Sequence, residues 1–215
     1  MSNYVFFGGS GSGKSVIAVN RALTMAAEQN ACVHFFDLDQ TKPLFRSRDL
    51  DALLAAANIS VHCERQFFDA PALNLGVKKF LADRDGVNIL DVGGDERGAR
   101  LIGQFAEGVN SERTRCFYVM NPYRPWASLE NEIAQSVAVI LRAARINDYE
   151  ILANPNLGEE TDEDTVIQGY FKLKESLGGA HICACCADAA FVPAVSAAID
   201  IPVWPLTQYI KMYQD

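Results

Sequence analysis

The chain has 215 residues, of which 49% are hydrophobic and 21% are charged, and its formal net charge is −8. This length and composition are typical of one soluble globular domain, and we expect residues 1–215 to form it. The acidic balance argues against nucleic acid or an anionic membrane surface as a partner. The sequence shows neither the basic and apolar regions of a signal peptide nor an apolar run long enough to span a bilayer. We therefore expect a cytoplasmic protein.

Strand-like and helix-like segments alternate along the sequence. Several strand segments are continuous apolar runs, which are typical of strands buried on both faces of a parallel sheet. The alternation predicts an α/β fold with three layers and a mostly parallel sheet. The expected strands are Tyr4–Phe7, Cys32–Leu38, Ser60–Cys63, Asn88–Val92, Cys116–Met120, Glu150–Ala153, His181–Cys185 and a short one near Pro202–Trp204. The expected helices are Ser15–Glu28, Asp49–Ala57, Ala72–Leu81, Ala99–Glu107, Ser128–Arg145, Asp162–Leu177 and Phe191–Ala198.

A glycine-rich loop connects the first expected strand to the first expected helix, and it satisfies the pattern G-x-x-x-x-G-K-[ST]. Glycines let backbone N–H groups turn toward phosphate oxygens, and the helix N-terminus adds a partial positive charge. We expect Lys14 to be exposed at the junction of loop and helix, where it can reach the β- and γ-phosphates of a nucleotide. The hydroxyl of Ser15 can ligate Mg²⁺. The residues of this predicted phosphate-binding loop are Gly8, Gly9, Ser10, Gly11, Ser12, Gly13, Lys14 and Ser15.

Acidic residues follow two of the expected strands. Asp37 and Asp39 come at the end of the second strand, and Asp91 comes at the end of the fourth. In an open parallel sheet, ligands bind beyond the carboxyl ends of the strands. We therefore expect these acids to lie in one crevice with the phosphate-binding loop, where carboxylates can hold magnesium and position water.

The order of these motifs resembles the P-loop NTPases related to MinD, ParA and the CobQ/CbiA synthetases. The resemblance continues through the strand followed by the turn at Asn121-Pro122 and through the strand whose end carries Asn154. It covers most of the chain up to about Gly158 and implies a P-loop NTPase fold with ATP and Mg²⁺ as cofactors.

The resemblance also implies a role for each matched residue. Lys14 is the phosphate-binding lysine, Ser15 and Asp91 belong to the magnesium site, and Asp37 is the acid near the metal. Asp39 positions the attacking water. Asn154 contacts the nucleobase, although a plain turn is an alternative interpretation because Pro155 follows it.

One position departs from the MinD and ParA pattern. Gly9 stands where much of that group has a second lysine, which reaches the nucleotide of a partner subunit. The sequence therefore does not support a lysine supplied across a dimer. Two pairs of arginines, Arg46 with Arg48 and Arg97 with Arg100, are candidate replacements, and exposed surface arginine is the alternative interpretation of each pair.

The expected function is that of a Mg²⁺-dependent ATPase acting as a nucleotide-driven conformational switch, with an unidentified protein partner and a homodimer as candidate assemblies. Two alternatives remain open. One is an ATP-dependent synthetase or transferase of the CobQ/CbiA type, and the other is a nucleotide-binding scaffold or metallocentre-maturation partner with little turnover. The stretch Asn154-Pro155-Asn156-Leu157 lacks the carboxylate of the guanine-reading pattern N-K-x-D, so we expect ATP to be preferred over GTP, or weak discrimination.

The cysteines bear on the scaffold alternative. Cys32 and Cys116 fall in expected strands, Cys63 ends another, and all three are expected in the core. The group Cys183-Ala184-Cys185-Cys186 has no paired C-x-x-C, so a buried strand with free thiols is favoured over a metal site.

Overall fold

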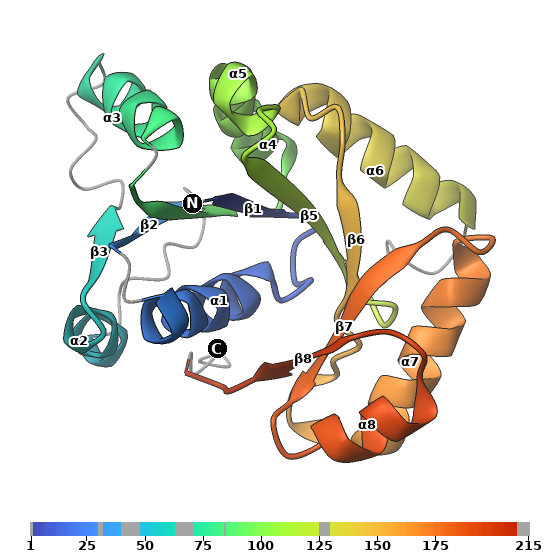
Figure 1. Ribbon diagram of the computed structural model, residues 1–215. Helices are drawn as coiled ribbons and strands as arrows, with labels where there is room; N and C mark the ends of the chain where they lie inside the picture. Colours follow the sequence, from blue (N-terminus) through green and yellow to red (C-terminus); the bar gives the residue numbers. More distant parts are fainter. Residues whose placement is uncertain are drawn as a thin grey trace.

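The computed structural model describes residues 2–29, 32–39, 48–62, 71–83, 85–124 and 130–209. Their strands form one sheet in the order β3-β2-β4-β1-β5-β6-β7-β8, and every pair of neighbours is parallel (Figure 1). The strands are β1 Asn3–Phe7, β2 Val33–Leu38, β3 Ile59–His62, β4 Val87–Val92, β5 Thr114–Met120, β6 Glu150–Ala153, β7 Ile182–Asp188 and β8 Val203–Leu206. The helices are α1 Lys14–Gln29, α2 Arg48–Ala56, α3 Pro71–Ala82, α4 Glu96–Ile102, α5 Ala106–Val109, α6 Glu130–Ala144, α7 Glu163–Ser176 and α8 Val192–Ala198.

Helices cover both faces of the sheet. In Figure 1, α1 and α2 lie on one side of β1–β4, and α3, α4, α5 and α6 lie on the other. Successive strand residues point to opposite faces, so Phe6 packs in the layer of α1 and Phe7 in the layer of α4 and α6. This division explains why several strands contain continuous apolar runs, and it confirms the predicted three-layer α/β fold.

The segment after β4 differs from the expected helix Ala99–Glu107. Helix α4 begins earlier because Asp95 caps it, its side chain accepting a hydrogen bond from the Gly98 N–H (2.9 Å). It also ends earlier, and a 3₁₀ turn at Gly103–Phe105 separates it from α5. A Cβ on Gly103 would lie 2.6 Å from the Ala143 carbonyl oxygen, so the turn lies directly against the C-terminal end of α6. This close tertiary approach at the point where α4 gives way to the 3₁₀ turn was not visible in the local pattern.

The cysteines divide into buried and exposed positions. Cys185 and Cys186 are buried in β7, Cys183 is partly buried, and Cys116 is buried in β5. Burial raises the pKa of the Cys183 thiol to about 11, which disfavours the thiolate form that binds metals. The expected core position of Cys32 is wrong, because this residue is exposed just before β2.

Some expectations lie outside the described residues, namely those for Cys63 and for the first two residues of the helix expected at Ser128–Arg145. Among the residues that are described, no three His, Cys, Asp or Glu side chains form a group that could hold a metal ion by themselves. Nor does any described helix have the length and apolar character needed to cross a membrane.

Candidate nucleotide site

The glycine-rich loop follows β1 and leads directly into α1, which begins at Lys14. Gly8 and Gly13 have φ angles of +143° and +89°, which L side chains rarely adopt. Space restricts both positions as well. A Cβ on Gly8 would lie 2.5 Å from the Val119 carbonyl oxygen in β5, and one on Gly13 would collide with the side chain of Asn154. The glycines therefore hold the loop close against β5 and the end of β6.

The expectation that Lys14 is exposed is wrong, because only 5% of its surface is accessible. The segment after β4 contributes to this burial. A Cβ on Gly94 would lie 2.8 Å from the Lys14 Nζ and 2.8 Å from the Ser10 Cα. The backbone at Gly94 thus covers the ammonium group and touches the loop itself, a contact between residues 84 positions apart.

Asp91 is the most unusual group of the site. It lies at the end of β4, is completely buried, and neither of its carboxylate oxygens has a hydrogen-bond partner among the described residues. Burial raises its pKa to about 6, while the nearby Lys14 ammonium and Ser15 hydroxyl favour the charged form and the Asp39 carboxylate opposes it. A buried, unpartnered carboxylate is costly, and such groups concentrate at functional sites.

The other two acids lie beside Asp91. Asp37 is its register partner on the neighbouring strand β2, and it is buried. The Asp37 Oδ1 accepts a hydrogen bond from the Asp39 N–H (3.1 Å), which fixes the turn at the end of β2. Asp39 is half-buried, and a Cβ on Gly93 would lie 3.5 Å from its Oδ1. The structure therefore brings the three acids together with Lys14 and Ser15, as the sequence predicted.

Asn154 also lies against the loop. It is buried at the end of β6, and its side-chain amide donates a hydrogen bond to the Ser12 carbonyl oxygen (2.7 Å). Because this hydrogen bond uses its Nδ2, the residue positions the glycine loop in the structure as it stands. Contact with a nucleobase remains a prediction.

Sequence reasoning missed Arg124, which lies in the turn after β5. Its Nε–H donates a hydrogen bond to the carbonyl oxygen of Gly11 at the tip of the loop (3.0 Å). The residue belongs to no motif, and the only signal was its position just beyond the carboxyl end of a strand adjacent to β1. That position places it at the same edge of the sheet as the loop.

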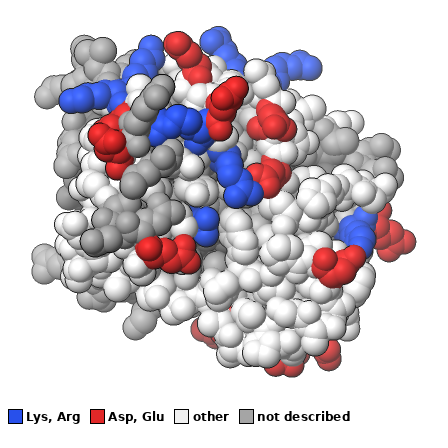
Figure 2. Space-filling view, viewed as in Figure 1, with Lys and Arg blue, Asp and Glu red and all other residues white. Residues whose placement is uncertain are grey.

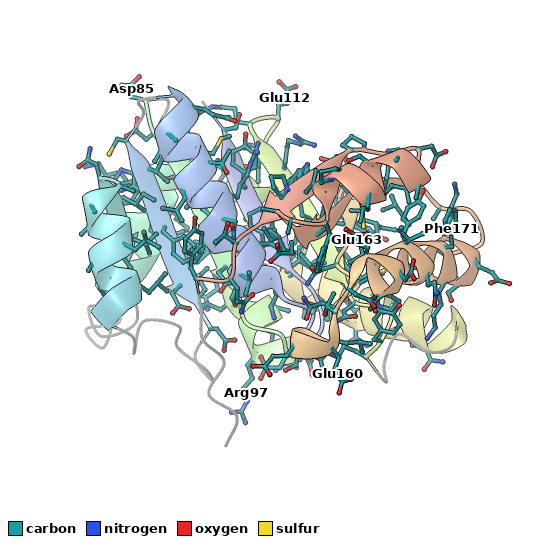
Figure 3. All side chains as sticks on the ribbon, turned by 90° about the horizontal axis from the view of Figure 1, so that it is seen from below. Asp85, Arg97, Glu112, Glu160, Glu163 and Phe171 are labelled. Atoms are coloured by element: carbon teal, nitrogen blue, oxygen red, sulfur yellow. The ribbon has the colours of Figure 1, made fainter. Side chains whose placement is uncertain are left out.

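None of the arginines that were expected to replace the second lysine contacts the loop among the described residues. Figure 3 shows Arg97 after β4 and Glu160 after β6 at one end of the molecule, with Asp85 and Glu112, which precede β4 and β5, at the opposite end. Arg97 is therefore at the correct edge of the sheet, but its side chain projects into solvent. Arg100 forms an exposed ion pair with Glu96 one turn away on α4 (2.6 Å). Arg46 and the side chain of Arg48 lie outside the described residues.

The oxygen atoms of this site suit a hard cation. Mg²⁺ prefers oxygen ligands and usually keeps several waters, binding through one or two carboxylates together with substrate phosphates. The oxygens of Asp91, the Ser15 hydroxyl and the neighbouring Asp37 match that requirement. A cage of protein ligands alone is absent from the described residues, so a phosphate ligand would have to complete the coordination.

Comparison with solved structures places the fold. FlhF complexed with GTP and Mg²⁺ matches with a TM-score of 0.51 at 14% identity, covering 82% of this chain and 61% of that chain. Chloroplast FtsY from Physcomitrella patens matches with a TM-score of 0.54 at 12% identity, covering 86% of this chain and 57% of that one. The chain has the fold of a P-loop NTPase. It spans less than two thirds of the length of either structure.

The sequence comparisons add no family. No protein-family model matches the chain, and no curated protein matches it. The resemblance to MinD, ParA and the CobQ/CbiA synthetases therefore remains a prediction within the P-loop NTPase fold. The identities to the solved structures are too low to extend the likeness beyond the fold.

Proposed function

We propose that this chain is a Mg²⁺-dependent ATP-binding protein that hydrolyses ATP slowly and uses the nucleotide as a conformational switch. One observation carries the proposal. Among the described residues, neither oxygen of the buried Asp91 carboxylate has a hydrogen bond of good geometry, and the Lys14 ammonium and Ser15 hydroxyl lie close to it at the glycine loop. A magnesium–nucleotide complex would supply a metal ion for the oxygens of Asp91 and phosphate oxygens for the loop and Lys14.

The residues of the site divide the chemistry among them. The backbone N–H groups of the loop and the Lys14 ammonium bind the phosphates and neutralise their charge. Ser15, Asp91 and Asp37 would hold the magnesium, which when bound screens the charge of the β- and γ-phosphates. Asp39, which is half-buried directly after β2, would orient the attacking water, so its contribution would be greatest in the transition state.

The contact between Gly94 and the loop supports a switch. Gly94 lies against the Ser10 Cα and the Lys14 Nζ, where a γ-phosphate would approach. A bound triphosphate would therefore displace the segment after β4. That segment continues through the cap at Asp95 into α4, which packs extensively on α6. Nucleotide binding would thus reach the outer helices through a short connection.

The preference for ATP follows from the residues beside Asn154. A dedicated guanine site uses a carboxylate, whereas Leu157 stands at that position and is 44% exposed. The corresponding position of this chain therefore offers no carboxylate acceptor that would require guanine. GTP is the ligand of FlhF in the matched complex. The two chains are 14% identical, so the base preference of this chain is argued from its own residues and not from that ligand.

A protein partner and a homodimer are part of the same proposal. Figure 2 shows that charged side chains gather on one part of the visible face, while the lower right part is largely uncharged. In Figure 1 this part corresponds to α8, whose sequence carries no charged residue and whose Pro193 and Ala197 are exposed. Such a surface suits another protein better than nucleic acid or an anionic membrane.

The test is incubation with ATP and with GTP, followed by analysis of binding and products. We expect ADP and phosphate to accumulate slowly from ATP alone, and ATP to compete at least as well as GTP. A preference for GTP of about 100-fold or more, of the order that a dedicated hydrogen-bonding site supplies, would contradict the assignment of the base. Turnover that required a second small substrate would instead indicate a synthetase or transferase, and binding without turnover would indicate a scaffold.

A further inference from the structure

The turn after β5 places an arginine on the tip of the phosphate-binding loop. Arg124 donates its Nε–H to the Gly11 carbonyl oxygen at 3.0 Å, and a Cβ on Gly11 would lie 3.1 Å from the same Nε. Gly11 has a φ of +73° and is exposed, so the guanidinium lies over a part of the loop that a ligand can reach. The inference that follows rests on the proposed nucleotide site.

The turn that carries Arg124 is held firmly. Asn121 is buried, donates its amide to the Asn156 carbonyl oxygen (2.7 Å) and accepts a hydrogen bond from the Tyr123 N–H (3.1 Å). The Tyr123 hydroxyl in turn donates to the Thr165 carbonyl oxygen in α7 (2.6 Å). These contacts tie the turn to the end of β6 and to α7. These hydrogen bonds therefore hold in place the turn from which the Arg124 side chain extends to the loop.

Residues 8–15 carry one cationic side chain, that of Lys14. Gly9 replaces the lysine that the resembling ATPases carry near the start of the loop, which leaves Lys14 as the loop's own cationic side chain. Arg97 and Arg100 are turned to solvent or paired on α4. A guanidinium has five N–H donors in a planar fork that matches phosphate oxygens, and the hydrogen bond to Gly11 uses one of them.

We propose that Arg124 is a phosphate-contacting residue of the same chain, which supplies the second positive charge to the triphosphate of the bound nucleotide. Its Nε remains anchored near Gly11, and its terminal N–H groups contact the β- and γ-phosphate oxygens. This arrangement places the charge where it develops during phosphoryl transfer and makes the site complete without a residue from a second subunit.

Two matched variants separate a charged contact from a merely structural one. In Arg124→Gln, the amide N–H can still donate to the Gly11 carbonyl, but the charge is lost. In Arg124→Lys, the charge is kept and the planar fork is lost. A phosphate contact predicts that kcat for ATP falls roughly 10²–10³-fold in Arg124→Gln, the range for removing one such donor, with a smaller loss in Arg124→Lys. Arg142→Ala, which removes an exposed arginine near the C-terminal end of α6, is the control and should leave kcat unchanged.

The affinities for ATP and ADP are measured in the same samples, together with far-UV circular dichroism. We expect Arg124→Gln to weaken ATP more than ADP, because the γ-phosphate is the group that ADP lacks. Wild-type kcat in Arg124→Gln, or equal losses for ATP and ADP, would show that Arg124 only braces the loop and would overturn the inference. Failure of the wild-type protein to bind either nucleotide would overturn the proposed function itself.

Discussion

Replacing Asp91 with asparagine should stabilise the nucleotide-free protein while impairing its magnesium-dependent function. The carboxylate is completely buried with neither oxygen hydrogen-bonded among the described residues, and burial raises its pKa from 3.8 to about 6. A carboxyl group whose pKa is raised by folding contributes stability below its unfolded pKa, and that stability is lost as the pH rises through about 6. At neutral pH the charge therefore opposes folding.

The size of the effect follows from the shift. A change from 3.8 to about 6 is about two pKa units, and each unit corresponds to about 1.4 kcal/mol, so the charged group costs about 3 kcal/mol at pH 7.5. Asparagine has nearly the same shape and no charge. We expect Asp91→Asn to recover part of this cost, up to about 3 kcal/mol, because its amide must still find partners in the same buried site.

Urea unfolding at pH 7.5 with EDTA measures the prediction. The midpoint should rise in Asp91→Asn with an unchanged slope, and the advantage should shrink at pH 5, where much of the wild-type carboxyl group is protonated. Asp51→Asn, which removes an exposed carboxylate on α2, is the control and should change the midpoint little. A lower midpoint in Asp91→Asn would refute the reasoning, since it would mean that the charge is satisfied in the folded protein.

Three further predictions concern other parts of the molecule. Asp39→Ala should slow ATP hydrolysis by roughly 10²-fold and leave ATP affinity nearly unchanged, and an unchanged hydrolysis rate would exclude Asp39 from water positioning. Gly94→Ala should destabilise the nucleotide-free protein by about 1–3 kcal/mol in urea, because its Cβ would press on the Ser10 backbone at 2.8 Å. The control is Gly76→Ala on α3, whose Cβ would meet no atom within 4 Å, so its stability should be unchanged or higher. An equal loss of stability in Gly94→Ala and Gly76→Ala would contradict the packing argument. Burial lowers the pKa of His34 and of His62, whose ring nitrogens lie 3.1 Å apart, so the stability they confer is full above pH 6.5 and falls as the pH drops below it. The double variant His34→Gln/His62→Gln should make the unfolding free energy depend less on pH between pH 7 and pH 5. An unchanged pH profile would show that the two histidines do not cause this dependence.

The parts of the site that were predictable from sequence depend on local geometry. A strand, a glycine-rich segment and a helix follow one another directly, so the loop could be recognised from the order of residues alone. The meeting of Asp37 and Asp91 was also predictable, because parallel strands end at the same edge of the sheet. Their direct register pairing across β2 and β4 adds a precision that the sequence pattern did not contain.

The parts that were missed depend on contacts between distant segments. The backbone at Gly94 lies close to the Lys14 ammonium group and helps to bury it. The residues around Lys14 in the sequence contain no pattern that predicts this contact. Arg124 reaches Gly11 across 113 positions of sequence. The early end of α4 coincides with a close approach of Gly103 to α6, which propensity along the helix cannot reveal. In each case tertiary packing decided what local preference left open.

The central claim is that Lys14, Ser15 and Asp91 form a site for a magnesium–ATP complex, and direct calorimetric titration of ATP into the protein tests it. We predict clear binding with Mg²⁺, much weaker binding with EDTA, and a loss of about 10- to 100-fold in affinity in Lys14→Ala with an unchanged far-UV spectrum, as expected for removing a hydrogen-bonded charge. Binding that is equally tight in Lys14→Ala and insensitive to EDTA would contradict the claim.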